Sequence, residues 1–317
     1  MANIIPKPFL TYEAQLHNLV HKKKLLVHDP QYAVSKLHDI CYYSLIDGYK
    51  DLFYDPMNRI YEQGTCFEDI VALYEFDEKL RSLIFQYICH IEQKLRSLIS
   101  YTFCEVYSEN QDSYLTPNNY NYSKKNKLAI QKLIQILNYE ANINTEHAYV
   151  LHQRNTYRNV PLWVIMNTLT IGQTSKMYSL LTTSMQSKIS KHFAYVSEKE
   201  LTQHLKLLTH FRNICAHNER LFSFHSRYEI PNTAIHAKLK IPKTGTQYIY
   251  GKHDLFAVII SFRYLLNKDD FSQLKKELSK IIIQFQKKTT TEKTDKLLTA
   301  MGFPTNWKNI TRYKHSK

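Results

Sequence analysis

Apolar residues recur every three or four positions along one long stretch of the chain, from residue 67 to about residue 107. The series consists of Leu73, Phe76, Leu80, Leu83, Tyr87, Ile91, Leu95 and Leu98. Positions three and four apart share one face of an α-helix, and no Pro or Gly interrupts the stretch. The pattern therefore predicts one long helix that buries a single apolar stripe over roughly seven turns.

The same periodicity predicts helices elsewhere. We expect two short helices before residue 51, and longer ones at residues 128–142, 161–181, 198–221, 253–266 and 271–287. Gly172 falls inside one of them, as a point of close helix packing. The polar segment 108–127 is predicted to be an exposed loop, and segment 237–251 a small hairpin or ordered loop. The predicted fold class is all-α with one minor β excursion.

The composition supports long helices. The 317 residues include 6 Gly and 9 Pro against 24 Tyr and 15 Phe, which argues against a Gly-rich nucleotide fold, a loop-rich sandwich or a disordered chain. Apolar runs such as 255–260 fall far short of the roughly 20 residues of a membrane-spanning helix. The N-terminus shows no export signal. Five cysteines without a CxxC pair favour a reducing, cytoplasmic location.

The charge balance indicates a polyanionic partner. Lys and Arg number 42 and Asp and Glu 28, which gives a formal net charge of +14. This excess favours nucleic acid or an anionic membrane surface as the partner. Two basic clusters are candidate RNA contacts, with solvated faces as the alternative: Lys22, Lys23 and Lys24, and Lys124, Lys125 and Lys127.

Segment 211–222 carries the candidate chemistry. Read as a helix, it places Arg212 on an apolar stripe, where a guanidinium needs an anionic or carbonyl partner; the stripe contains Leu201, Leu205, Leu208 and Cys215. A second, polar ridge contains His210, Asn213, His217 and Arg220. Arg212 and His217 lie about 140° apart around an ideal helix. They can converge on one ligand only if the helix ends or bends near His217, or if a second copy of the chain completes the site.

These residues also have structural interpretations. Arg212 can pair with Glu92 of the long helix, while Glu92 can instead form a local pair with Arg96. His217 can be a helix-terminal histidine, and His210 a flanking residue of the polar ridge.

Other chemistries find less support in the sequence. Cys215 beside His217 suggests a thiol nucleophile, but its place on the apolar stripe favours a buried cysteine. The histidines show no spacing typical of a metal site, and there is no Walker loop or GxGxxG motif. We therefore predict no metal and no cofactor. Tyr42, Tyr43 and Tyr49 can stack on unpaired bases, although packing is the favoured interpretation.

Several motifs together resemble a known family. Arg212-Asn213, followed by His217 and then by Asn218, Arg220, Leu221 and Phe222, resembles the abortive-infection (Abi) family of the AbiD/AbiF type, which looks like a branch of the HEPN superfamily. Segments 6–12, 91–96 and 161–163 are similar to other family motifs. Segment 42–49 resembles a further motif but has one extra residue before Gly48. The resemblance covers most of the chain.

The resemblance implies a HEPN-like helical bundle with terminal additions. It implies an N-terminal helical segment at residues 1–60, a core at 61–230 that carries the motif, and a C-terminal region at 231–317 with the hairpin, helices and a basic tail. HEPN ribonucleases are understood to cut RNA without a metal, through attack of the ribose 2′-OH on the adjacent phosphorus. His217 would then be the general acid/base, Arg212 the phosphate clamp, and Asn213 an orienting residue. His210, Asn218, Glu92 and Arg96 would support this site, and Arg220 would contact RNA.

Three functions follow as hypotheses. The first is a phage-defence toxin, an endoribonuclease restrained by a structured RNA or a small protein antitoxin and working as a homodimer or larger assembly. The second is a HEPN module that holds a structured RNA without cutting it. The third, a structural helical adaptor, is disfavoured by the charge balance.

Overall fold

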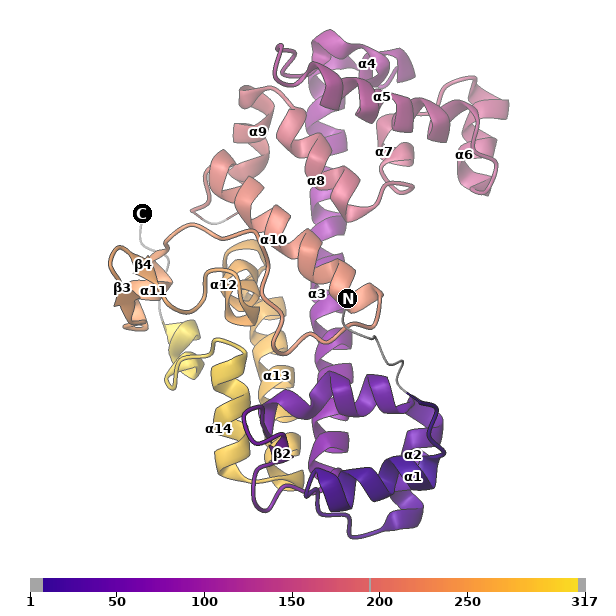
Figure 1. Ribbon diagram of the computed structural model, residues 1–317. Helices are drawn as coiled ribbons and strands as arrows, with labels where there is room; N and C mark the ends of the chain where they lie inside the picture. Colours follow the sequence, from indigo (N-terminus) through magenta and orange to yellow (C-terminus); the bar gives the residue numbers. More distant parts are fainter. Residues whose placement is uncertain (1–7, 194, 313–317) are drawn as a thin grey trace, which may run out of the picture.

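The computed structural model describes residues 8–193 and 195–312, and most of these are helical (Figure 1). Two antiparallel strand pairs interrupt the helices: β1 (Tyr54–Asp55) with β2 (Ile60–Tyr61), and β3 (Lys243–Thr244) with β4 (Gln247–Tyr248). The helices are α1 (Tyr12–His17), α2 (Pro30–Ile40), α3 (Phe67–Tyr107), α4 (Gln111–Leu115), α5 (Lys127–Asn142), α6 (Ala148–His152), α7 (Leu162–Ile165), α8 (Ile171–Leu180), α9 (Thr183–Ser190), α10 (Glu198–Ala216), α11 (Ala234–Lys238), α12 (Leu255–Leu265), α13 (Lys268–Lys288) and α14 (Thr291–Ala300). The predicted all-α class is confirmed.

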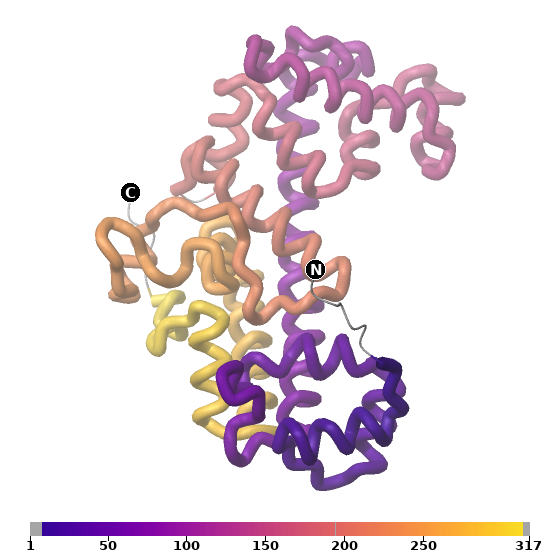
Figure 2. The backbone as a smooth tube through the Cα atoms, viewed as in Figure 1, coloured from indigo at the N-terminus to yellow at the C-terminus, as the bar shows by residue number. Residues whose placement is uncertain are grey.

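Helix α3 is the axis of an elongated molecule. Its 41 residues span roughly 60 Å at 1.5 Å per residue. The N-terminal helices, α13 and α14 surround one end of α3, and α4 to α7 gather at the other (Figures 1 and 2). Helix α10 packs against α3 near the middle, and also against α8, α9 and α12. One cluster of buried apolar side chains runs through the whole molecule, from Leu16 to Ile310.

The prediction for α3 is confirmed, since the helix spans residues 67–107 and buries the predicted stripe except for Leu98, which is half-buried. The hairpin at 243–248 and the helices α5, α12 and α13 are also confirmed, with ends that shift by a few residues. Gly172 lies where α8 approaches α10, because a Cβ atom there would sit 3.5 Å from the Thr209 methyl group.

The predicted helix at 161–181 is wrong as a single element. The chain leaves α7 after Ile165 and begins α8 at Ile171. Thr170 caps α8, and its side chain and that of Gln173 form a reciprocal capping box. The guanidinium of Arg96 binds the carbonyl oxygen of Leu169 and stabilises the break. A contact 73 residues away in sequence is not visible in a local pattern.

Three other expectations need correction. The segment 108–127 is not a plain loop, because Asn110 caps the short helix α4 and a 3-10 turn follows. Helix α10 ends at Ala216, five residues before the predicted end at Leu221. Helices α6, α9, α11 and α14 were not predicted. Of the N-terminal motif at 6–12, Pro6 and Lys7 lie outside the described residues, whereas Thr11 caps α1.

A buried carboxylate joins three distant parts of the chain. Asp77 of α3 is fully buried. It accepts hydrogen bonds from the Tyr49 hydroxyl (2.9 Å) and from Nη1 of Arg81 (2.7 Å). It also accepts bonds from the backbone amides of Leu221 (2.9 Å) and Phe222 (2.8 Å). The carboxylate therefore fixes the segment that follows α10 to the central helix.

Within the described residues, no helix combines the length and the apolar character needed to cross a bilayer.

Replacing Asp77 with Asn should destabilise the protein by about 3–5 kcal/mol, because the buried Arg81 would lose its counter-charge. The measurement is the free energy of unfolding from guanidinium denaturation. Glu105→Gln is the matched control on the same helix, since Glu105 pairs with Lys188 at the surface (3.1 Å) and should cost less than about 1 kcal/mol. Equal losses in the two variants would contradict this role for Asp77.

Candidate functional site

The C-terminus of α10 places His217 at a helix end. His217 is the C-cap residue, and Asn218 follows with φ of 57°, a left-handed conformation that Asn tolerates better than most residues. The amide of Glu219 donates to the carbonyl of Ile214 (3.1 Å), and the amide of Asn218 to that of Cys215 (3.3 Å). These two bonds form a Schellman motif. The helix thus ends near His217, which is one of the two arrangements considered in the sequence analysis, and the side chains of His217 and Asn218 are exposed.

The segment after the helix is tied to the N-terminal region. Nη1 of Arg220 donates to the Gly48 carbonyl (2.7 Å) and to Oδ2 of Asp51 (2.8 Å). The next two amides bind Asp77, as described above. Arg220, which we expected to contact RNA, therefore forms an ion pair with Asp51 and a hydrogen bond with Gly48 of the 42–49 motif. Its side chain is still 35% exposed.

Arg212 forms no ion pair and no hydrogen bond in the described part of the chain, although Glu92 is close enough to sense its charge: burial raises the pKa of the Glu92 carboxyl, and Arg96 and Arg212 oppose that shift. The Arg212 guanidinium lies over the ring of Phe85 on α3, 5.5 Å from the ring centre. Its Nε atom is buried and makes no hydrogen bond. The expected ion pair with Glu92 is absent, because the Glu92 carboxylate pairs with Arg96 on the same helix. A buried donor without an acceptor costs about 1–3 kcal/mol, but Nε of the paired Arg96 is left in the same way, so this atom alone does not mark an anion site.

A pocket of about 290 Å³ lies between α3 and the end of α10, and one of its lining residues, Phe85, is the residue that Arg212 contacts. Its lining residues are Glu78, Arg81, Ser82, Phe85, Cys215, Ala216 and Asn218. Arg81 forms a charged wall that is almost completely buried, and its Nη1 binds Asp77, Tyr49 and the Glu219 carbonyl. Phe85 contributes an aromatic face that Arg212 also contacts.

Sequence reasoning missed Arg81, Phe85 and Asp77. A usable signal was present, because Asp77 and Arg81 are four residues apart within the apolar stripe, as expected for a buried ion pair.

The predicted residues are only partly brought together. Arg212 and Asn218 lie at or beside the pocket, and Asn213 is exposed one turn before His217. No hydrogen bond, ion pair or ring contact joins Arg212 to His217 in the described residues. One copy of the chain therefore does not join the two side chains directly.

His210 takes the structural interpretation. Its Nδ1 atom lies 2.9 Å from the Ser226 hydroxyl, and its ring packs edge-on against Phe224 and Tyr228. Burial, together with the positive charge of Arg227, lowers the pKa of this imidazole. A neutral, partnered ring of this kind positions the loop that follows α10.

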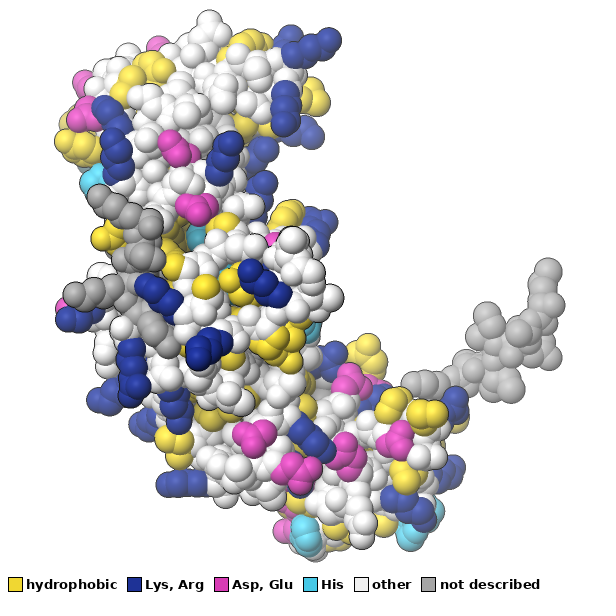
Figure 3. Space-filling view, turned by 90° about the vertical axis from the view of Figure 1, so that its left-hand side faces the viewer, with side chains coloured by type: hydrophobic (Ala, Val, Ile, Leu, Met, Phe, Trp, Pro, Cys, Tyr) yellow, Lys and Arg dark blue, Asp and Glu magenta, His cyan; other side chains and the backbone are white. Residues whose placement is uncertain are grey.

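The two predicted basic clusters lie at opposite ends of the molecule. Lys22 and Lys24 follow α1 and are exposed, while Lys23 donates to the Tyr54 hydroxyl (2.9 Å). Lys124, Lys125 and Lys127 are exposed where α5 begins. Lys and Arg side chains also spread along the length of one face instead of forming one patch (Figure 3). A ligand that reaches both clusters must extend along the molecule.

The three tyrosines considered for base stacking differ in their exposure to solvent. Tyr49 is buried on Asp77, and Tyr42 packs partly buried against the core, so both take the packing interpretation. Tyr43 is 77% exposed, and it is the one of the three whose ring is open to solvent.

Comparison with known proteins identifies one family. The family model described as "Abi-like protein" matches residues 35–223, which include α3, the whole of α10 and the Arg212–His217 motif. No curated protein and no solved structure gives a significant match.

Cys215 should react slowly with alkylating agents at neutral pH. Burial, with the negative charge of Asp77, raises the pKa of its thiol to about 12, whereas hydrogen bonding with Ser44 lowers the pKa of the exposed Cys41 thiol. The thiolate is the reacting form, so Cys41 should be labelled first and labelling of Cys215 should require alkaline pH. Peptide mass spectrometry after iodoacetamide treatment measures both. Rapid labelling of Cys215 at neutral pH would restore the thiol-nucleophile interpretation.

Proposed function

Because the chain belongs to the Abi-like protein family, we propose that it acts in phage defence by abortive infection, as an endoribonuclease toxin of the HEPN type. The observation that carries the proposal is the position of Arg212, which forms no ion pair within the described residues and lies over Phe85, a residue that lines an open pocket, five residues before the exposed His217. These are the residue types that cleavage at a phosphodiester needs. The net charge of +14 supports a nucleic-acid substrate.

The proposed reaction uses the RNA's own 2′-OH as the nucleophile. This oxygen bonds to the adjacent phosphorus, the bond from phosphorus to the 5′-oxygen breaks, and a 2′,3′-cyclic phosphate and a 5′-hydroxyl result. A base must take the 2′-OH proton, and an acid must supply one to the leaving oxygen. Histidine, with an unperturbed pKa of about 6.5, can do either near neutral pH. We assign this role to His217.

Arg212 stabilises the charge that develops on the phosphorane oxygens. The Phe85 ring fixes the guanidinium from one side, and no ion pair within the described residues competes for it. The pocket between Arg81, Phe85 and Asn218 then accommodates the nucleotide next to the scissile phosphate, with Phe85 available for stacking on a base. Asn213, one turn before His217, orients the imidazole or the phosphate.

A second copy of the chain completes the site in this proposal. Arg212 and His217 share no contact within one chain, so each copy supplies part of a composite site. A toxin of this kind must also be restrained before infection. A structured RNA suits the positive surface as the restraining partner, and a small protein is the alternative.

Replacing His217 with Ala should reduce RNA cleavage by a factor of about 10² to 10⁴, which is the usual contribution of general acid–base catalysis. Purified protein is incubated with total RNA in EDTA, and the fragment ends are analysed. The wild-type protein should leave 2′,3′-cyclic phosphates.

The control for this experiment is His225→Ala, which removes an exposed histidine from the loop after α10 and should leave cleavage unchanged. Equal cleavage by wild type and His217→Ala would exclude His217 from catalysis. Absence of wild-type cleavage, with a discrete RNA retained on the purified protein, would support the non-catalytic RNA-binding module instead.

Removing the basic cluster at the start of α5 should weaken the binding of RNA whatever the sequence of that RNA. The variant replaces Lys124, Lys125 and Lys127 with Gln, and it should lower the slope of log affinity against log salt concentration by about 2. Fluorescence anisotropy over a salt series measures this slope. The charge-matched control replaces Lys276, Lys280 and Lys287, which are exposed on α13. Equal loss in both variants would show that net charge, and not this cluster, determines binding.

A further inference from the structure

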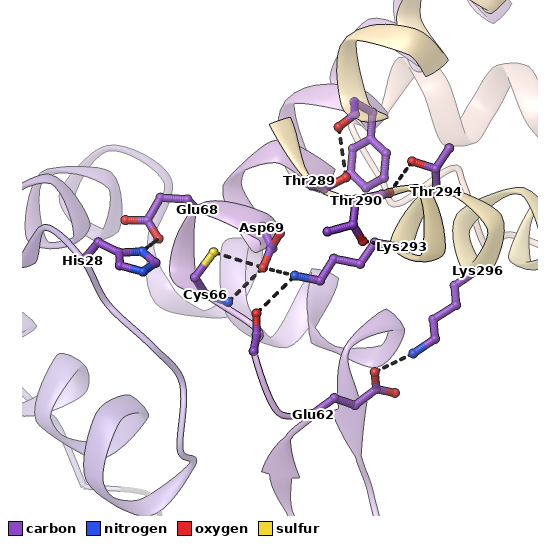
Figure 4. A network of polar contacts seen from close by, with 12 residues as sticks. His28, Glu62, Cys66, Glu68, Asp69, Thr289, Thr290, Lys293, Thr294 and Lys296 are labelled. Carbon is purple, nitrogen blue, oxygen red and sulfur yellow. Dashed lines mark hydrogen bonds and ion pairs between the residues drawn. The ribbon is translucent and has the colours of Figure 1, made fainter. Parts of the chain in front are cut away.

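The chain before α2 pairs with the start of α3. The amide of Leu26 donates to the carbonyl of Thr65 (3.1 Å), and the amide of Phe67 donates to the carbonyl of Leu26 (2.8 Å). These bonds form an isolated parallel bridge between Leu26 and Cys66. The bridge carries His28 to the N-terminus of α3, where its ring faces Glu68 with the Cys66 thiol nearby (Figure 4).

Three different ligand types meet at this point. The Nδ1 atom of His28 is 3.3 Å from Oε2 of Glu68. One ligand atom from each of His28, Cys66 and Glu68 lies within 4.8 Å of the other two. Small side-chain rotations would bring all three onto one ion. We propose that these three side chains bind a single Zn²⁺ ion, with water in the fourth position.

The ligand chemistry favours zinc over other common ions. A thiolate, an imidazole and a carboxylate are the three ligands that Zn²⁺ uses in proteins, and three of them leave a place for water in a tetrahedral site. Mg²⁺ and Ca²⁺ prefer oxygen ligands throughout. Sequence analysis predicted no metal because the histidines show no spacing typical of a metal site.

Cys66 also serves α3 itself, since its side chain and that of Asp69 form a reciprocal capping box. Cys66 is the N-cap of α3, a position where Ser, Thr, Asp or Asn is preferred. Its Sγ atom lies 3.0 Å from Oδ2 of Asp69, and its backbone amide donates to the same oxygen (2.8 Å). Asp69 also binds Lys293 of α14 (2.5 Å), so it belongs to the cap and orients the thiol from outside the ligand set.

Metal binding must remove a proton from the thiol. Zinc then competes with that proton, and its affinity should increase as the pH rises.

The site is independent of the proposed nuclease. Nineteen residues of helix separate Cys66 from Phe85, which is roughly 28 Å along the axis of α3. A metal there would fasten the chain at residues 26–28 to the start of α3, and it would take no part in RNA cleavage. Failure of one proposal therefore leaves the other standing.

Cobalt is the probe for the test. Full-length protein is freed of metal under reducing conditions and titrated with Co²⁺, whose thiolate complexes absorb in the near ultraviolet and whose tetrahedral complexes absorb in the visible. We expect one Co²⁺ per chain, displaced by Zn²⁺ but not by Mg²⁺. Cys66→Ser should remove the thiolate band, and His28→Ala and Glu68→Gln should each weaken Zn²⁺ binding at least about tenfold.

Matched controls separate this site from adventitious binding. Cys41→Ser removes an exposed cysteine, and His38→Ala removes a histidine that also pairs with a neighbouring carboxylate, Asp39 (3.4 Å). Neither should change the Co²⁺ spectrum. Serine is a favourable N-cap, so Cys66→Ser should stay folded, which circular dichroism verifies. No thiolate band in the wild type, or equal loss in Cys41→Ser, would overturn the proposal.

Discussion

The arrangement of the candidate site depends on the hydrogen bonds that the buried carboxylate of Asp77 accepts. This carboxylate lies inside the molecule with the guanidinium of Arg81, and it accepts four hydrogen bonds from three separate parts of the chain. Buried charges are tolerated only when they are paired and fully bonded. This requirement fixes the direction in which the chain leaves α10. It thereby also fixes the position of His217 at the end of that helix.

Two consequences follow for the site. Because Leu221 and Phe222 are held by Asp77, the helix must stop before them, and Asn218 supplies the left-handed residue that allows it to stop. The same network places Arg81 as a wall of the pocket next to Arg212. The residues of the Arg212–Phe222 motif therefore divide into two groups. Those at its beginning are available to a ligand, whereas those at its end hold the motif in place.

The sequence allowed prediction of elements that depend on local patterns. The predicted ends of helix α3 agree with the observed ends, because its apolar stripe is continuous and no Pro or Gly interrupts it. The break between α7 and α8 was not predicted, since it depends on a contact from Arg96 to a distant carbonyl. Arg212 and His217 were identified from the motif, but Arg81 and Phe85 come from another helix. The distance between the two lysine clusters likewise became clear only from the fold.

The central claim is that the chain cuts RNA through the ribose 2′-OH next to the scissile phosphate, with Arg212 and His217 acting on that phosphate. The most direct measurement uses an RNA that contains one mapped cut site, compared with the same RNA carrying a single 2′-deoxyribose at that position. The account predicts that the substituted bond resists cleavage while the two RNAs bind with similar affinity. Cleavage of the substituted bond at the normal rate would contradict it.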